Sequence, residues 1–175
     1  MLRPTITMLA ALLAWSAAAT ASEPPAGWAL TVSPEGVCLI GADYAFGRGL
    51  VSRLVFAVAD DNRTLRIANW REDFELEPGT TYEVAVRVDQ GAPLTATAEV
   101  LERRMFAISV PIAPSIVAAL MTGQLLLIDT ARSTLSFTLD RTDQALRALL
   151  ACALDREGER GSRETVVRRG RDPFR

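Results

Sequence analysis

One short segment constrains the fold of this chain more than any other, because its side chains alternate with period two. In YEVAVRVD, residues 82–89, every second residue from Tyr82 to Val88 is apolar or aromatic, and the residues between them are charged or small. This alternation is typical of a β-strand with one buried face. The turn-forming DQGAP, residues 89–93, leads into LTATAEV, residues 94–100. We therefore expect a β-hairpin.

Most of the remaining chain also predicts strands, with two helices. Further strands are expected over 28–32, 36–41, 50–59, 64–69, 104–110, 124–128 and 133–139. The glycine-punctuated segment 41–49 is expected to be a loop. Ser115–Thr122 predicts a short helix that is apolar nearly all round and so should be buried, and Gly123 suits its end. A last helix is expected from Thr142 to about Leu154, with its apolar face on the core. The fold class is α+β, an antiparallel, sandwich-like sheet core with two short packing helices.

The first 21 residues have the organisation of an export signal. Arg3 is followed by the apolar run Ile6–Trp15 and by the small-x-small site Ala19-Thr20-Ala21, which predicts cleavage before Ser22. No later run is long enough to cross a membrane. We expect one α+β domain over 22–154 in a periplasmic or secreted protein.

Two cysteines, Cys38 and Cys152, are the only ones in the chain. In an oxidising compartment an even pair favours a disulfide, although two buried free thiols remain an alternative. The pair lacks the C-x-x-C spacing of a redox site, so the predicted bond is structural.

Residues 155–175 differ from the domain, because they hold seven arginines and five acids and little that could be buried. This composition predicts a charged, disordered tail. The arginines could contact an anionic membrane surface, although the interleaved acids weaken that idea. Without Arg3 the processed chain has 18 basic and 21 acidic residues, a net charge of −3, which does not indicate nucleic-acid binding.

The sequence excludes several chemistries. It has no histidine, which removes histidine-based triads and the commonest zinc sites. It has no phosphate-binding glycine motif, and we expect no cofactor. The run LLLIDTARSTLSF, residues 125–137, leaves one catalytic alternative, since Asp-Thr after an apolar strand is how retropepsin-like aspartic proteases present their carboxylate. Such an enzyme needs two carboxylates and would have to be a dimer using Asp129. The sequence favours a turn between two strands instead, because Ala131 stands where that family has Gly and Asp is common at the start of a turn.

A recognition surface is the other functional candidate. Trp70 and Phe74 lie close in sequence and are flanked by charges, a combination that occurs at binding surfaces and also in half-buried sheet residues. The acidic stretch 71–77 does not match a calcium-binding loop.

Several motifs resemble those of a family of exported bacterial proteins. They are ANW (68–70), EPGTTYEVAVRVDQG (77–91), AALMTGQLLLI (118–128) and LSFTLDRTDQALRALLAC (135–152). The order of turn, V-x-V-x-V-D strand and L-x-x-G-x-x-L step is also distantly similar to the invasion-associated locus B family of periplasmic proteins, from which the cysteine placement differs. The resemblance covers about half of the processed chain, and its motifs are structural. No catalytic residue can therefore be carried over from it. Together with the missing chemistries, we expect a non-enzymatic envelope protein that binds or assists a partner, either another envelope protein or a surface.

Overall fold

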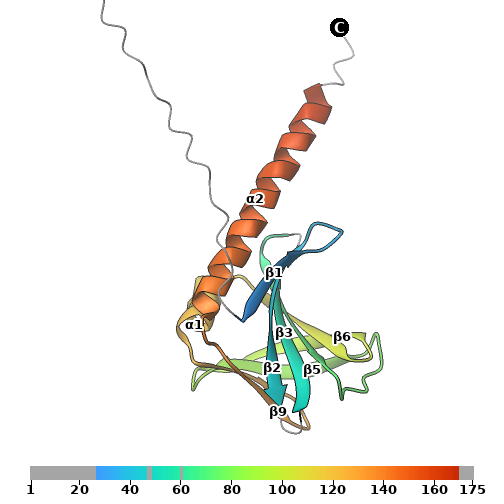
Figure 1. Ribbon diagram of the computed structural model, residues 1–175, viewed down its shortest axis with the longest axis vertical. Helices are drawn as coiled ribbons and strands as arrows, with labels where there is room; N and C mark the ends of the chain where they lie inside the picture. The colour runs from blue at the N-terminus through green and yellow to red at the C-terminus, as the bar shows by residue number, and fades with distance from the viewer. Residues whose placement is uncertain (1–26, 47–48, 60, 170–175) are drawn as a thin grey trace, which may run out of the picture.

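The computed structural model describes residues 27–46, 49–59 and 61–169, and over these residues it contains nine strands and two helices (Figure 1). The elements are β1 (Trp28–Val32), β2 (Cys38–Phe46), β3 (Leu50–Val58), β4 (Thr64–Arg71), β5 (Thr81–Val88), β6 (Leu94–Glu102), β7 (Met105–Pro111), α1 (Pro114–Thr122), β8 (Leu125–Asp129), β9 (Thr134–Thr138) and α2 (Thr142–Arg169).

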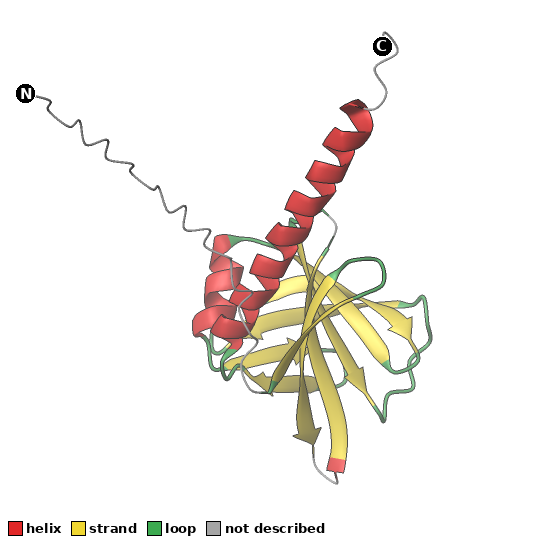
Figure 2. Ribbon diagram, turned by 45° about the horizontal axis from the view of Figure 1, so that its top comes forward, coloured by secondary structure: helices red, strands yellow, loops and turns green. Residues whose placement is uncertain are grey.

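All the described strands belong to one antiparallel sheet with the order β1-β2-β3-β4-β7-β6-β5-β8-β9. The predicted hairpin is confirmed, since β5 pairs with β6 in antiparallel register. Val84 and Val86 are buried, as their alternation predicts. The expected antiparallel sheet is thus present, but it is a single curved sheet rather than two stacked ones (Figure 2).

The curvature brings the two ends of the sheet together without a strand ladder between them. The hydroxyl of Tyr44 on β2 donates to the carbonyl of Thr138 on β9 at 2.8 Å, and its ring meets Phe137 edge-on. The indole of Trp28 on β1 donates to the carbonyl of Asp140 at 3.0 Å. Burial raises the pKa of Tyr44 to about 12, with a smaller effect from the charge of Asp140. Side chains from β1 and β2 therefore close the half-barrel.

The core fills the concave side of this sheet and is covered by the first turns of α2. Leu146 and Leu149 are almost fully buried there, as the sequence predicts for the apolar face of the last helix. In Figure 1, α2 passes beside β1 and continues well beyond the sheet, while α1 lies beside the lower end of α2.

Two local predictions are wrong. Residues 41–46, expected in a loop, extend β2 and pair with β3 up to Phe46, because Ala42 and Tyr44 alternate onto the core face. Helix α1 is not buried all round, since Leu120 is its one buried residue. Gly123 ends this helix, as expected, with an extended backbone (φ −75°). Glycine is required here because a Cβ at this position would overlap Cγ1 of Val88.

The last helix is longer than its sequence predicts. The apolar face ends near Leu154 and the composition of 155–175 predicts disorder, but α2 continues to Arg169. Once a helix has been nucleated by packing, each further residue costs little, and Arg and Glu are good helix formers. Residues 170–175 and the predicted signal at 1–21 lie outside the described residues. Neither described helix is long and apolar enough to span a bilayer.

Candidate functional site

Cys38 and Cys152 form the predicted disulfide, with sulfur atoms 1.99 Å apart and Cα atoms 6.1 Å apart. The bond joins the first residue of β2 to the middle of α2. Cys38 is almost completely buried. The bond therefore fixes the helix against the sheet, and a bond of this kind is typical of an extracytoplasmic protein.

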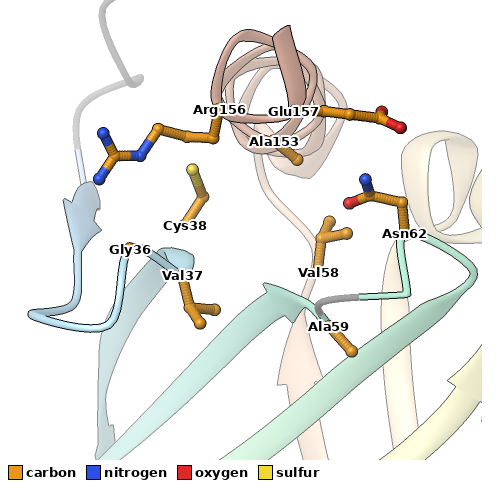
Figure 3. Close-up of a pocket in the computed structure, with 9 residues that line it drawn as sticks. All are labelled: Gly36, Val37, Cys38, Val58, Ala59, Asn62, Ala153, Arg156 and Glu157. Carbon is orange, nitrogen blue, oxygen red and sulfur yellow. The ribbon is translucent and has the colours of Figure 1, made fainter. Parts of the chain in front are cut away.

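A small cavity of about 20 Å³ lies beside this bond (Figure 3). It is lined by Gly36, Val37, Cys38, Val58, Ala59, Asn62, Ala153, Arg156 and Glu157. A volume of this size holds roughly one water molecule. The disulfide region is therefore a structural junction and not a ligand pocket.

Asp129, the residue of the protease alternative, is the last residue of β8 and begins the turn to β9. Its Oδ1 accepts a hydrogen bond from Thr134 at 2.6 Å, and its Oδ2 accepts one from Nε of Arg87 at 3.1 Å. The Thr134 hydrogen bond, followed by that of Arg87, lowers the pKa of Asp129. A carboxylate that shares a proton in a catalytic dyad needs the opposite shift for one partner. This geometry favours the turn interpretation.

Trp70 lies on the convex side of the sheet, in a row contributed by four strands. Asp43 of β2 pairs with Arg53 of β3, Arg53 with Trp70 of β4, and Trp70 with Met105 of β7. We call these four residues the Trp70 row. Trp70 and Met105 are half-buried, whereas Arg53 and Asp43 are exposed. A partly exposed tryptophan between a methionine and an arginine has the composition of an interface centre.

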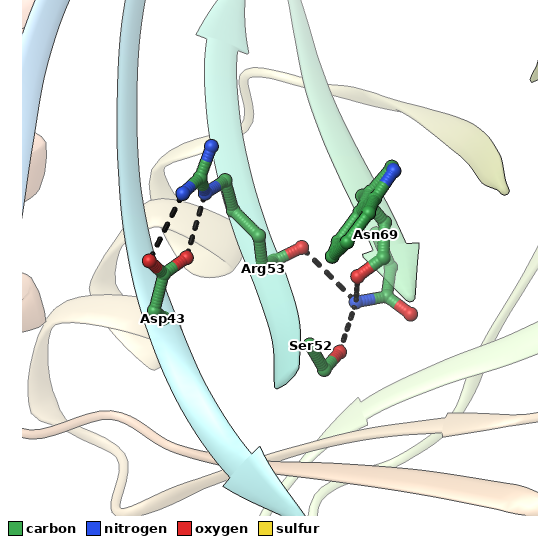
Figure 4. A network of polar contacts seen from close by, with 5 residues as sticks. Asp43, Ser52, Arg53 and Asn69 are labelled. Carbon is green, nitrogen blue, oxygen red and sulfur yellow. Dashed lines mark hydrogen bonds and ion pairs between the residues drawn. The ribbon is translucent and has the colours of Figure 1, made fainter. Parts of the chain in front are cut away.

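The arginine of this row is held in place. Its Nε and Nη2 donate to the two carboxylate oxygens of Asp43 at 2.6 and 2.9 Å (Figure 4). This hydrogen bonding lowers the pKa of Asp43. A planar two-point pair fixes the guanidinium orientation.

A buried amide supports the same row from the concave side. Nδ2 of Asn69 donates to Oγ of Ser52 at 2.7 Å and to the carbonyl of Arg53 at 3.1 Å. Asn69 and Ser52 are both fully buried. The backbone at Arg53 is therefore anchored from inside, while its side chain faces outward (Figure 4).

Phe74 lies in the loop after β4, beside a cleft of about 210 Å³. Its ring packs on Phe106 at 5.9 Å, and the guanidinium of Arg71 lies 5.0 Å above it. Arg71 also binds Asp73 through two hydrogen bonds, which lower the pKa of Asp73. The cleft is lined by Glu72, Asp73, Phe74, Glu75, Arg103 and Arg104. It is smaller than most pockets for drug-sized ligands.

The structure does not bring Trp70 and Phe74 onto one face. Phe74 contacts Phe106, which is buried and lies opposite the inward-facing Asn69. Trp70 follows Asn69 directly on β4 and lies opposite Met105. Because successive residues of a strand face opposite sides, Trp70 faces the side of the sheet away from Asn69 and Phe106. They are two separate candidates. Among the described residues, no three possible ligands gather to form a metal site.

Comparison with known proteins shows a similarity of fold. No protein-family model and no curated protein matches the sequence. Among solved structures, the crystal structure of invasion associated protein b from Bartonella henselae matches with a TM-score of 0.53 and 17% identity, over 71% of this chain and 92% of that one. The chain has a similar fold to that protein. The distant resemblance noted from the sequence motifs is thus supported at the level of fold.

Two of those motifs meet in space. The carboxylate of Asp89, at the end of YEVAVRVD, accepts hydrogen bonds from the backbone N–H groups of Gln124 and Leu125, the shortest at 2.8 Å. Gly123 leaves the room that Val88 occupies. The end of the V-x-V-x-V-D strand and the L-x-x-G-x-x-L step therefore form one junction between β5 and β8. This structural contact accounts for both motifs, and neither needs a catalytic role.

Sequence reasoning missed Asp43, Arg53 and Met105 as neighbours of Trp70. They come from positions 43, 53 and 105, and only the sheet register places them side by side. One signal was available for Asp43, since the alternation of Ala42, Tyr44 and Phe46 with Asp43 and Ala45 favours a strand.

Proposed function

We propose that the protein is a non-enzymatic periplasmic binding module, and that the Trp70 row contacts its partner, another envelope protein. One observation carries this proposal: a half-buried tryptophan on the convex face lies between Met105 and an arginine that Asp43 holds in a fixed orientation. Such a site presents apolar area and directed donors at little entropic cost on binding. The disulfide and the fold similarity to invasion associated protein b agree with an extracytoplasmic role.

The direct test is site-specific photo-crosslinking in the periplasm of a producing cell. A photoreactive residue replaces Trp70, and in a matched control it replaces Thr97, which is exposed on the same convex side of β6. A discrete adduct from position 70 is expected, and none from position 97. Equal adducts from both positions, or none from position 70, would contradict the assignment.

Binding to the partner so identified is then measured with Trp70→Ala and Arg53→Gln. Truncation of a central tryptophan should weaken binding roughly 30-fold or more. Loss of the oriented guanidinium should cost about 10-fold. The folded content of both variants is checked by circular dichroism.

The protease alternative predicts a different result. A dimeric aspartic protease would cleave peptides at acid pH and lose all activity on Asp129→Ala. We expect no cleavage by either form, because both carboxylate oxygens of Asp129 are occupied by structural hydrogen bonds. Cleavage that depends on Asp129 would overturn the non-enzymatic proposal.

A further inference from the structure

The cleft of about 210 Å³ beside Phe74, which we call the Phe74 cleft, is formed by two separate segments of the chain. One is the loop that follows β4, and the other is the turn that joins β6 to β7. The loop contributes Glu72, Asp73, Phe74 and Glu75, and the turn contributes Arg103 and Arg104. The proposed contact through the Trp70 row uses none of these residues.

Backbone hydrogen bonds join the two segments at both ends of the loop. The N–H of Arg71 donates to the carbonyl of Arg104 at 3.0 Å, and the N–H of Leu76 donates to the carbonyl of Arg103 at 2.8 Å. The ring of Phe74, between these two bonds, packs against the core. The cleft is therefore preformed, and a ligand can bind without first ordering the loop. Walls that are joined at both ends, around a small volume, suit a chain end better than a continuous chain.

Two arginines of the cleft have no partner among the described residues. Arg103 and Arg104 are exposed, and neither side chain forms an ion pair or a hydrogen bond with another described residue. Arg71, by contrast, donates two hydrogen bonds to Asp73 and lies 5.0 Å from the centre of the Phe74 ring. Two neighbouring guanidinium groups that line one cleft are therefore available to an anionic ligand.

The charge balance of the cleft selects the kind of anion. Glu72 and Glu75 line the same cleft, and they too form no ion pair with a described residue. Their charges balance those of the two turn arginines, while Arg71 and Asp73 balance each other. A dianion such as phosphate would gain little net attraction in such a cleft. A single carboxylate with a positive charge nearby would meet an opposite charge at both places.

We propose that the Phe74 cleft binds the free carboxyl end of a peptide chain. The terminal carboxylate accepts hydrogen bonds from Arg103 and Arg104. A basic side chain shortly before the end lies near Glu72 and Glu75. The last side chain is apolar and contacts Phe74, which is half-buried and gives the cleft its apolar surface.

The position of the cleft allows one partner to occupy both sites. Trp70 directly precedes Arg71, and Met105 directly follows Arg104. The Trp70 row and the cleft therefore adjoin at the ends of β4 and β7. The inference rests on the proposed function only in taking the bound chain end to be that of the partner at the Trp70 row.

The test is an NMR titration of the isotope-labelled processed chain, beginning at Ser22, with the peptide acetyl-Gly-Ser-Lys-Ala-Leu. The backbone signal of Phe74 and the Nε signals of Arg103 and Arg104 should shift, because the carboxylate binds there. The same peptide with an amidated end should bind at least about 10-fold more weakly, since it lacks the charge that strengthens these hydrogen bonds. Free leucine has the same carboxylate without the basic side chain and should bind more weakly than the peptide.

Changing both Arg103 and Arg104 to Gln should weaken binding of the free-acid peptide by at least about 10-fold. The matched control changes Arg63 and Arg132 to Gln, two exposed arginines in the connections β3–β4 and β8–β9. Both variants have the same net charge, so only the position of the arginines differs. The control should bind within about two-fold of the parent chain, because long-range effects of exposed charges are screened.

A second peptide, with Glu in place of Lys, tests the acidic side of the cleft. It should bind about three-fold more weakly than the first, since Glu72 and Glu75 repel it. The difference between the two peptides should disappear when Glu72 and Glu75 are both changed to Gln. A difference that persists in this variant would contradict the assigned role of the two carboxylates.

Four results would overturn the proposal as a whole: no shifts at about 10 mM peptide, equal binding of the free acid and the amide, an equal loss of affinity in the control variant, or equal binding of free leucine. The last result would assign the cleft to a free amino acid. Crosslinking from position 70 does not depend on these titrations, so the Trp70 proposal and the cleft proposal can fail separately.

Discussion

Removal of the Cys38–Cys152 bond gives the most quantitative test of how this chain is stabilised. Both cysteines are changed to Ala, because a single change leaves a reactive thiol and Ser would place a hydroxyl where Cys38 is only 3% exposed. The double change removes two sulfur atoms and little other apolar packing. The main effect should come from the unfolded chain, which gains freedom when the loop is opened.

The magnitude follows from the span of the loop. The two cysteines are 114 residues apart in sequence, and for a loop of that length the chain-entropy model gives about 4.8 kcal/mol at 25 °C. In a domain of this size 1 kcal/mol shifts Tm by roughly 3–5 °C. The double variant should therefore melt roughly 15–25 °C below the oxidised parent.

Urea unfolding followed by circular dichroism separates this mechanism from a simple loss of packing. If the bond acts on the unfolded state, the variant exposes more surface on unfolding, so its m value should rise as well as its midpoint fall. The reduced parent should behave like the variant. A stability loss below about 1 kcal/mol with an unchanged m value would refute the loop-closure reasoning.

Three further changes test individual contacts, and a fourth tests a pH dependence. Gly123→Ala should lower stability by roughly 1–3 kcal/mol, because its Cβ would overlap Val88. Gly158→Ala in α2, where a Cβ meets nothing within 4 Å, should raise stability by up to about 1 kcal/mol. The stability of both glycine variants is measured from their urea midpoints. Equal effects of the two changes would contradict the packing argument. Asp89→Ala should cost roughly 1–2 kcal/mol through the loss of charged hydrogen bonds to the β8 backbone, and an unchanged midpoint would show that water replaces them. For Asp129→Asn, the folded pKa of Asp129 lies below the ordinary value of 3.8, so the carboxylate stabilises the fold above that pH and this contribution is lost as the pH falls through the folded pKa. The difference in Tm between the parent chain and Asp129→Asn should therefore shrink as the pH falls from about 5 through 3.8 and below, and a constant difference would disprove the assignment.

The strands could be predicted because their information is local. Val84 and Val86 are buried and Glu83 is exposed, as period-two alternation requires. The predicted strand over residues 28–32 has the same bounds as β1. Failures arose where a local signal competed with tertiary structure. The glycines near residues 41–49 suggest a loop, but pairing with β3 keeps residues 41–46 extended.

The predictions for the two helices failed for opposite reasons. Helix α1 is apolar in sequence, yet Leu120 is its one buried residue, because the helix packs mainly against α2 and not inside the sheet. The distal part of α2 is polar in sequence, yet it is helical to Arg169, because a packed stem supplies the nucleus. Composition measures how much surface a segment can bury, not where the fold places it.

The candidate site shows the limit of sequence reasoning more sharply than the fold does. Trp70 can be identified from its own residue type, but Asp43, Arg53 and Met105 gain their meaning only from the registers of β2 with β3, β3 with β4, and β4 with β7. The motifs that carry the resemblance could be identified from sequence, and the structure shows their role: Asp89 and Gly123 lie at a structural junction between β5 and β8. Our proposal therefore directs the search for a partner to the Trp70 row, whose neighbours only the structure reveals.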